Sequence, residues 1–312
     1  MGNSCCSEAV EALERVARRS LGLFTISEAR ALGVSKEQLR NHTRPGGRFV
    51  RMFPRVYALA RVAPTAQSRL LAALLWAGPE GVLSHSTAGA ILRFDGVRPG
   101  PVELWHPSRT GPPAGITLHT GTLPPGDIVT RGYLRCTGLR RTVGDLATVL
   151  DDDTLELVVE SALRQDPRLE LTSASSRGRA SMHRVLARRP PDAPPTESEL
   201  ETRYLQLIRT ADLPPPQRQY QVRDAAGRCL WRLDVCWPEA RLWVELDGRG
   251  THAQPAAVLS DRHRQNELAV RLQWAPLRFT WDDVTVRGAE TVCLTESAYK
   301  RGLGWEGLPG GP

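Results

Sequence analysis

Three carboxylates around one predicted turn are the residues of this chain best placed to do chemistry. They are Asp234, Glu245 and Asp247, within the stretch LDVCWPEARLWVELDGRGTH that ends at His252. Residues 238–240 supply a turn between two strands. Because the side chains of a strand alternate between its two faces, Glu245 and Asp247 should point to the same side. Antiparallel pairing about the turn brings Asp234 opposite or diagonal to Glu245.

Carboxylates this close repel one another, and each raises the pKa of its neighbour. A divalent cation removes the conflict, and Mg²⁺ prefers carboxylate and carbonyl oxygens as ligands. The pattern therefore favours a metal site that holds Mg²⁺, or Mn²⁺ in its place. The competing interpretation is that these side chains only meet water, as polar residues on the exposed face of a sheet usually do.

The carboxylates belong to a longer series of motifs in the last third of the chain. In order, the motifs are TESELETRYL, LPPPQRQY, LD, WVELDG with a histidine, DRHRQNEL and LRFTWDDV, between Thr196 and Val284. Together they resemble the Vsr-like domain of the PD-(D/E)XK nuclease superfamily, which is related to very-short-patch mismatch-repair endonucleases. The resemblance implies an α/β fold with a central mixed sheet and a Mg²⁺-dependent phosphodiester site.

The same resemblance implies roles for individual residues. Asp234 matches the central metal-binding aspartate, and Glu245 matches the acidic residue of the following strand. Glu201 resembles the acidic residue on the first helix of the fold, and His252 a histidine that Vsr-type enzymes hold near the metal. With Asp247, these residues form the catalytic set that the resemblance predicts.

The chain departs from the superfamily at one position, because Asp247 stands where many members have a lysine. A lysine would orient the attacking water or offset charge in the transition state, and an aspartate cannot copy either role electrostatically. The two lysines of the chain, Lys36 and Lys300, both lie outside the motifs. The departure keeps open the alternative that the nuclease fold is inactive.

Other side chains could supply what the lysine would. His252 could act as the general base, since imidazole titrates near neutrality, and Arg249 or Arg262 could offer positive charge. Arg262 and Arg264 lie on a following predicted helix that could face phosphate. The alternative without a catalytic role is that Glu201 lies on a solvated face of its helix and that His252 lies in an exposed loop.

Residues 8–62 have the pattern of a winged helix-turn-helix. The apolar spacing predicts an amphipathic helix over Glu8–Arg18 and short helices over Glu28–Leu32 and Lys36–Thr43, the last capped by Ser35. A predicted turn at Gly46-Gly47 is followed by two wing strands, FVRMF and VYAL.

A winged helix of this kind would place the helix that begins at Lys36 in the major groove of DNA. Glutamine and asparagine can read adenine edges, whereas arginines mostly contact phosphate. The predicted DNA-binding residues on this helix and on the wing are Lys36, Gln38, Arg40, Asn41, Arg44, Arg48 and Arg51. The alternative is a module that docks another protein.

This segment, together with VLSHSTAGAIL from Val82 and LRRTVGDLA from Leu139, resembles AbiEi-type antitoxin-like proteins. That family belongs to abortive-infection toxin–antitoxin systems and represses its own promoter through the winged helix. The resemblance implies DNA binding and, beyond DNA, a toxin partner or a homodimer.

Composition is consistent with a polyanionic partner. The 312 residues carry a formal net charge of +7 with a pI near 9.4, which suits DNA, although an arginine-rich composition is also typical of genomic base bias. The six cysteines form no CxxC pair, which indicates reduced thiols in a cytoplasmic protein. No apolar run approaches a membrane span, so we expect no membrane partner. His85, His106 and His119 share no metal-binding spacing, which predicts separate structural roles.

The predicted architecture is α/β, with Pro/Gly-rich stretches marking the boundaries. In order, it has a winged helix-turn-helix (1–65), an α+β middle domain (66–165), a linker (166–195), a Vsr-like domain whose restriction-endonuclease-like mixed sheet is flanked by helices (196–300), and a disordered tail (301–312). The predicted function is a DNA-binding protein whose Mg²⁺-dependent endonuclease domain hydrolyses DNA phosphodiester bonds. The alternative is a transcriptional regulator or antitoxin of a toxin–antitoxin system with a catalytically inactive nuclease fold.

Overall fold

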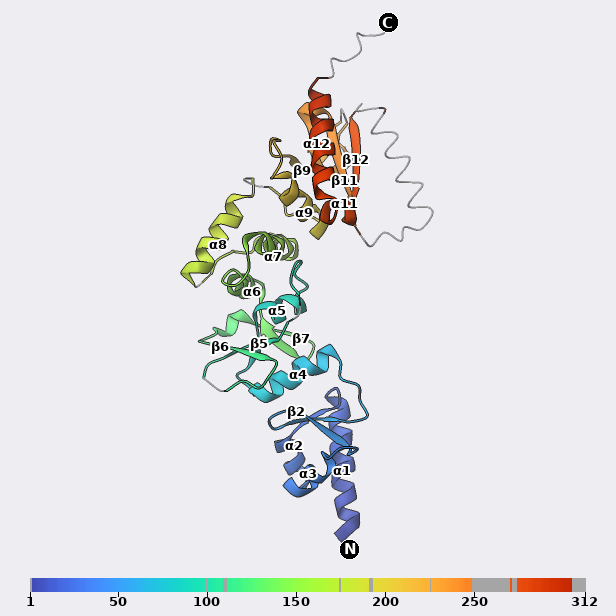
Figure 1. Cartoon of the computed structure of the whole chain (residues 1–312). Helices are drawn as coiled ribbons and strands as arrows, with labels where there is room; N and C mark the ends of the chain where they lie inside the picture. The colour runs from blue at the N-terminus through green and yellow to red at the C-terminus, as the bar shows by residue number, and fades with distance from the viewer. Residues whose placement is uncertain are drawn as a thin grey trace. The chain divides into compact units, whose positions relative to one another are not determined.

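The computed structural model describes residues 2–98, 100–108, 111–173, 175–190, 193–224, 226–248, 270 and 274–304 (Figure 1). The contacts of the chain divide it into two compact units. The first comprises Met1–Val149 with Glu170–Arg179, and the second Leu150–Leu169 with Ala180–Pro312. Both units combine helices with sheets, so the predicted α/β class is confirmed.

The first unit begins with three helices and a small antiparallel sheet of order β1-β3-β2. Thr25 and Ser35 start the second and third helices with capping boxes, each accepting a hydrogen bond from a backbone N–H of the first turn. The apolar side of the first helix packs against Phe24 and Phe49. The elements are α1 (Gly2–Arg19), β1 (Leu23–Thr25), α2 (Ile26–Ala31), α3 (Lys36–His42), β2 (Phe49–Phe53) and β3 (Val56–Leu59). The first helix thus begins at Gly2, and the prediction that it begins at Glu8 is wrong.

The remainder of the first unit is built on a five-stranded mixed sheet of order β6-β5-β4-β8-β7. The β5–β6 and β4–β8 pairs are parallel, and the β4–β5 and β7–β8 pairs are antiparallel. Its elements are α4 (Ala66–Ala77), β4 (Val82–Leu83), α5 (His85–Ile91), β5 (Val102–His106), β6 (Ile116–Thr120), η1 (Pro125–Asp127), β7 (Ile128–Arg131), β8 (Leu134–Thr137) and α6 (Leu139–Leu146).

The second unit contains a four-stranded mixed sheet of order β12-β11-β10-β9, in which β11 and β12 run parallel. Apolar residues of α9, including Leu200 and Tyr204, share a core with Val235 and Val244 of the two central strands. The elements are α7 (Asp152–Gln165), α9 (Glu199–Ile208), β9 (Gln217–Arg223), β10 (Cys229–Trp237), η2 (Pro238–Ala240), β11 (Leu242–Asp247), β12 (Ala275–Thr280), α11 (Trp281–Thr285) and α12 (Gly288–Leu303), and α8 (Ser176–Ala187) spans the division between the units.

The last helix corrects one predicted boundary. We expected a disordered tail from residue 301, but α12 continues to Leu303, so the prediction is wrong for residues 301–303. Residues 305–312 lie outside the described part of the chain. By contrast, the predicted turn at residues 238–240 and the two strands beside it are confirmed.

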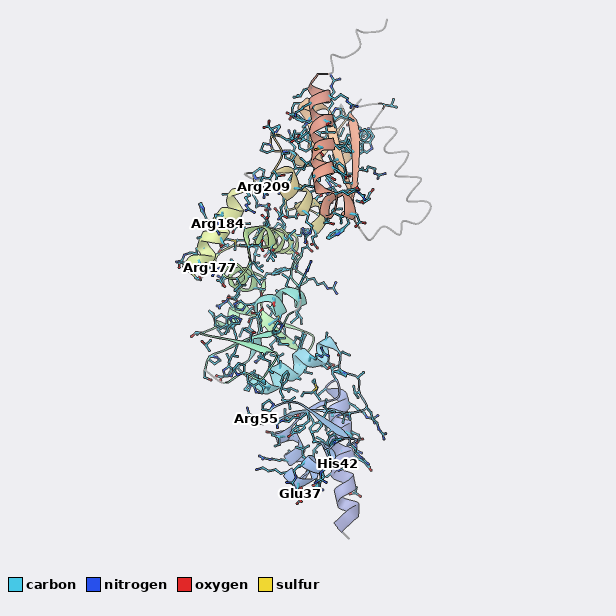
Figure 2. The ribbon with its side chains drawn as sticks, in the orientation of Figure 1. Glu37, His42, Arg55, Arg177, Arg184 and Arg209 are labelled. Carbon is cyan, nitrogen blue, oxygen red and sulfur yellow. The ribbon has the colours of Figure 1, made fainter. Side chains whose placement is uncertain are left out.

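Buried ion pairs tie α7 to the rest of the second unit. Glu156 and Glu160 of this helix are both 1% exposed. Arg209, which Figure 2 labels, donates to Glu156 at 2.6 Å, while Arg189 and Arg218 both donate to Glu160. A buried carboxylate needs such partners because its desolvation is otherwise costly. Although α7 was predicted to close the middle domain, its contacts assign it to the second unit.

Candidate active site

Asp234 lies on β10 next to the antiparallel strand β11. The register pairs Val235 with Val244, so the next pair along the two strands is Asp234 with Glu245. The backbone N–H of Leu246 donates a long hydrogen bond of 3.4 Å to Oδ2 of Asp234. The hairpin therefore places two of the predicted metal ligands on adjacent strands, directly across from each other.

Glu245 and Asp247 share a cationic partner on the neighbouring strand. Parallel pairing of β11 with β12 sets Glu245 beside Arg278. The guanidinium Nη2 of Arg278 lies 2.8 Å from Oε2 of Glu245, and its Nε lies 3.6 Å from Oδ2 of Asp247. Because one side chain contacts both carboxylates, they point to the same side of the sheet, as the alternation predicts.

Glu201 is buried on the first turn of α9, with only 3% of its surface exposed. Its two oxygens accept hydrogen bonds from the amide of Gln219 at 2.7 Å and from the backbone N–H of Glu197 at 2.5 Å. Burial raises the pKa of Glu201 to about 8, the hydrogen bond from Glu197 opposes the shift, and the negative charge of Asp234 adds to it. The interpretation of Glu201 as part of a solvated helix face is therefore wrong.

Reasoning from the sequence did not identify two residues of this site, Gln219 and Arg278. Gln219 has a φ of +51°, an unusual conformation for a residue other than glycine, and the register of β9 with β10 sets it opposite Asp234. Both residues lie within the motifs LPPPQRQY and LRFTWDDV, which mark them as candidates. The strand register sets Arg278 beside Glu245, whereas the contact of Gln219 with Glu201 depends on how α9 packs against the sheet.

The acidic residues suit Mg²⁺ by ligand type but do not form a tight cluster. Within the described residues, one group of three His, Cys, Asp or Glu side chains has its ligand atoms all within 4.8 Å of one another, and it lies in the first unit. Asp234 and Glu245 offer hard oxygen ligands, but Arg278 already neutralises Glu245. An ion at this site would compete with Arg278 for the Glu245 carboxylate.

Several predicted residues of the site fall outside the described chain. They are His252, Arg262 and Arg264, together with Arg249. The geometry of the site is therefore defined by the residues of α9, β10, β11 and β12.

The predicted DNA-binding residues are mostly exposed on α3 and the adjoining hairpin. Figure 2 shows α3 by its labelled residues Glu37 and His42, and Arg40 approaches Glu37 to 3.6 Å. Gln38 is half-buried, and its Oε1 accepts a hydrogen bond from the backbone N–H of Ser35 as part of the helix cap, so it has a structural task as well. The remaining residues are exposed, namely Lys36, Arg40, Asn41, Arg44, Arg48 and Arg51.

The prediction of separate roles is wrong for two of the three middle-segment histidines. The rings of His85 and His119 stack with centroids 3.6 Å apart, and Nε2 of His119 lies 2.8 Å from Oε2 of Glu103. Burial and then repulsion from His119 lower the pKa of His85 to about 4. Burial opposes ionisation of Glu103, but hydrogen bonds from His119 and Ser86 outweigh it and lower its pKa to about 2. His106 lies apart, with Nδ1 near Ser108.

Comparison with known proteins finds sequences in Mycobacterium tuberculosis that are similar to this chain. No known family profile matches it. It is similar to two proteins of Mycobacterium tuberculosis, "Uncharacterized protein MT2308" of strain CDC 1551 / Oshkosh and "Uncharacterized protein Rv2248" of strain ATCC 25618 / H37Rv. Each is 28% identical over 257 residues, which cover 80% of this chain and 92% of the relative. This length exceeds that of either unit, so the similarity extends into both.

One solved structure, of the RV2827C protein from Mycobacterium tuberculosis, matches 61% of this chain and 83% of its own at 16% identity, with a TM-score of 0.33. Within the described residues, no helix is both long and apolar enough to span a bilayer.

Proposed function

We propose that this protein binds DNA through its first unit and that its second unit is a Mg²⁺-dependent endonuclease-like domain. The observation that best supports the proposal is the adjacency of three acidic residues from three elements. Glu201 of α9 is buried against the charge of Asp234 on β10, and Asp234 lies across from Glu245 on β11. Carboxylates brought together at the cost of mutual repulsion are typical of sites that bind a cation.

In this proposal the residues of the chain divide the work. Asp234 and Glu245 would hold the ion, which when bound polarises the scissile phosphate and lowers the pKa of a bound water. Gln219 fixes the Glu201 carboxyl group by its 2.7 Å hydrogen bond, so that group is oriented before an ion or a phosphate arrives. Arg278 supplies the nearest described positive charge to Glu245, in a region where the related enzymes have a lysine.

A specific observation also favours the second candidate, a transcriptional regulator or antitoxin with an inactive nuclease fold. Arg278 contacts Glu245 and Asp247 together, as a cation would. The ion pair could replace the metal and stabilise the sheet without chemistry. DNA binding by α3 and the β2–β3 hairpin would then be the main activity, with a toxin or a second copy as partner.

Cleavage of DNA separates the two candidates. Purified protein is incubated with supercoiled and mismatched duplexes, with and without Mg²⁺ or Mn²⁺, beside Asp234→Ala and Glu245→Ala variants. We expect metal-dependent nicking that both substitutions abolish. The matched control is Glu239→Ala, which removes an acid from the turn of the same hairpin, where its carboxylate accepts a hydrogen bond from Tyr299. Intact DNA binding with no nicking in either metal would reject the endonuclease and support the transcriptional regulator or antitoxin.

Replacement of Arg48 by alanine tests DNA binding by the hairpin. Arg48 forms an exposed ion pair with Glu14 at 3.3 Å, so its loss should leave folding unchanged. If Arg48 contacts phosphate, affinity should fall uniformly across sequences, and the slope of log K against log salt should decrease by about 0.9. Titrations from low to high salt measure the slope, with Arg18→Ala on α1 as a control of equal charge. An unaltered affinity and slope would remove Arg48 from the interface.

A further inference from the structure

We propose that His85, Glu103 and His119 form a second metal site, for a divalent transition-metal ion of the zinc class. One ligand atom of each side chain lies within 4.8 Å of the other two. The site belongs to the first unit, whereas the carboxylates around Asp234 belong to the second. It is therefore independent of the proposed nuclease chemistry.

The sheet of the first unit brings these residues together. Glu103 and His119 stand on the adjacent parallel strands β5 and β6, where Glu103 pairs with Thr117 and His119 with Trp105. Residues two positions apart on neighbouring strands share a face, so their side chains can meet. His85 is the first residue of α5, directly after β4, which pairs with β5 on its other side.

Neighbouring serines orient two of the three ligands. Oγ of Ser84 lies 3.0 Å from Nδ1 of His85, which leaves Nε2 as the nitrogen able to bind an ion. The backbone N–H of Ser86 donates to Oε1 of Glu103 at 3.1 Å, and its hydroxyl donates to the same oxygen. The other oxygen of Glu103 is thereby directed towards His119. Such supporting hydrogen bonds are typical of metal ligands, whose orientation and basicity they set.

The backbone of His85 adopts an uncommon conformation in this arrangement. Its φ of +47° lies in the left-handed region, which few residues other than glycine adopt, although histidine enters it more often than most. Conformations of this kind are concentrated at functional sites, where the surrounding structure enforces them. Here the conformation places a buried imidazole, 4% exposed, against His119 and about 6 Å from the Trp105 ring.

The donor set identifies the class of ion. Two imidazoles and one carboxylate suit Zn²⁺ and similar ions, and three protein ligands leave a fourth position open. Mg²⁺ strongly prefers oxygen ligands and should not bind here. The two rings are stacked within 15° of parallel, so binding requires the imidazoles to turn until both nitrogens point at the ion. The ion would replace the hydrogen bond between His119 and Glu103.

Metal titration of the full-length chain tests the site. We expect the wild type to bind one Zn²⁺ per chain. His119→Ala and Glu103→Gln should each lower the affinity for Zn²⁺ at least 100-fold, and Ser86→Ala should lower it about 10-fold. His183→Ala, which removes an exposed histidine from α8, should bind as the wild type does. Co²⁺ should give visible absorption that the same two variants lose.

Circular dichroism in the absence of metal checks that each variant folds, and Glu103→Gln keeps the shape of the side chain if His119→Ala does not fold. A wild-type chain without stoichiometric Zn²⁺ would overturn the proposal. So would Zn²⁺ binding that persists in the folded Glu103→Gln and His119→Ala variants, since the ion would then lie elsewhere.

Discussion

Replacement of Glu201 by glutamine should remove most of the decrease in stability that the wild-type protein shows as pH rises from about 5 to about 8. The pKa of Glu201 is about 8 in the folded chain, against an ordinary value of 4.5. Between these values the folded state holds a proton that the unfolded state has released. The free energy of unfolding therefore falls as pH rises through this window, and it is highest below pH 4.5.

Across this pH window the raised pKa of Glu201 lowers the free energy of unfolding by at most about 5 kcal/mol. Glutamine cannot ionise, so the variant should match the wild type near pH 5 and exceed it at pH 8. Urea unfolding in a chelating buffer measures the difference. Tryptophan fluorescence is suitable because the second unit holds six of the eight tryptophans, including the buried Trp237 and Trp243. Glu290→Gln, at an exposed position on α12, is the control, and an equal pH dependence in Glu201→Gln and wild type would contradict the assignment.

Removal of the Arg278 guanidinium should change metal affinity and cleavage in opposite directions. Arg278 competes with a bound ion for Glu245, so Arg278→Ala should bind Mg²⁺ about 10-fold more tightly, a gain of about 1.4 kcal/mol. If its charge also stabilises the reacting phosphate, cleavage at saturating Mg²⁺ should fall about 100-fold. Arg278→Lys should retain part of the activity because it keeps the charge.

Nicking assays and metal titrations on the same preparations check both effects. Arg287→Ala is the control, since Arg287 is an arginine of the second unit that pairs with Asp283 instead. Faster cleavage by Arg278→Ala than by the wild type would show that Arg278 blocks the site, and it would contradict a role for Arg278 in stabilising the reacting phosphate.

Local signals explain what the sequence predicts well. Thr25 and Ser35 indicate helix starts because their side chains bond to nearby backbone, and that requires no distant partner. The hairpin between β10 and β11 is equally local, since a short turn fixes which residues face each other. The sequence alone therefore suffices to place Asp234 and Glu245 together.

Contacts between distant segments explain what the sequence does not reveal. Arg278 meets Glu245 only because β11 and β12 pair in parallel, and a parallel pair requires a long crossover that fixes no register by itself. His85 and His119 stack because β4, β5 and β6 are neighbours in one sheet, although 34 residues separate the two histidines in the chain. Spacing rules for metal ligands do not detect such a pair.

The ion pairs of α7 bear on where this protein can be shortened. A fragment that starts at Thr196, where the motifs begin, would lack Glu156 and Glu160. Arg218, whose side chain is 7% exposed, and Arg209 would then lose their carboxylate partners. A buried guanidinium without a counterion destabilises a fold by several kcal/mol, so such a fragment should express poorly and aggregate. A fragment that contains the second unit should instead begin near Leu150, which keeps the helix with the sheet it supports.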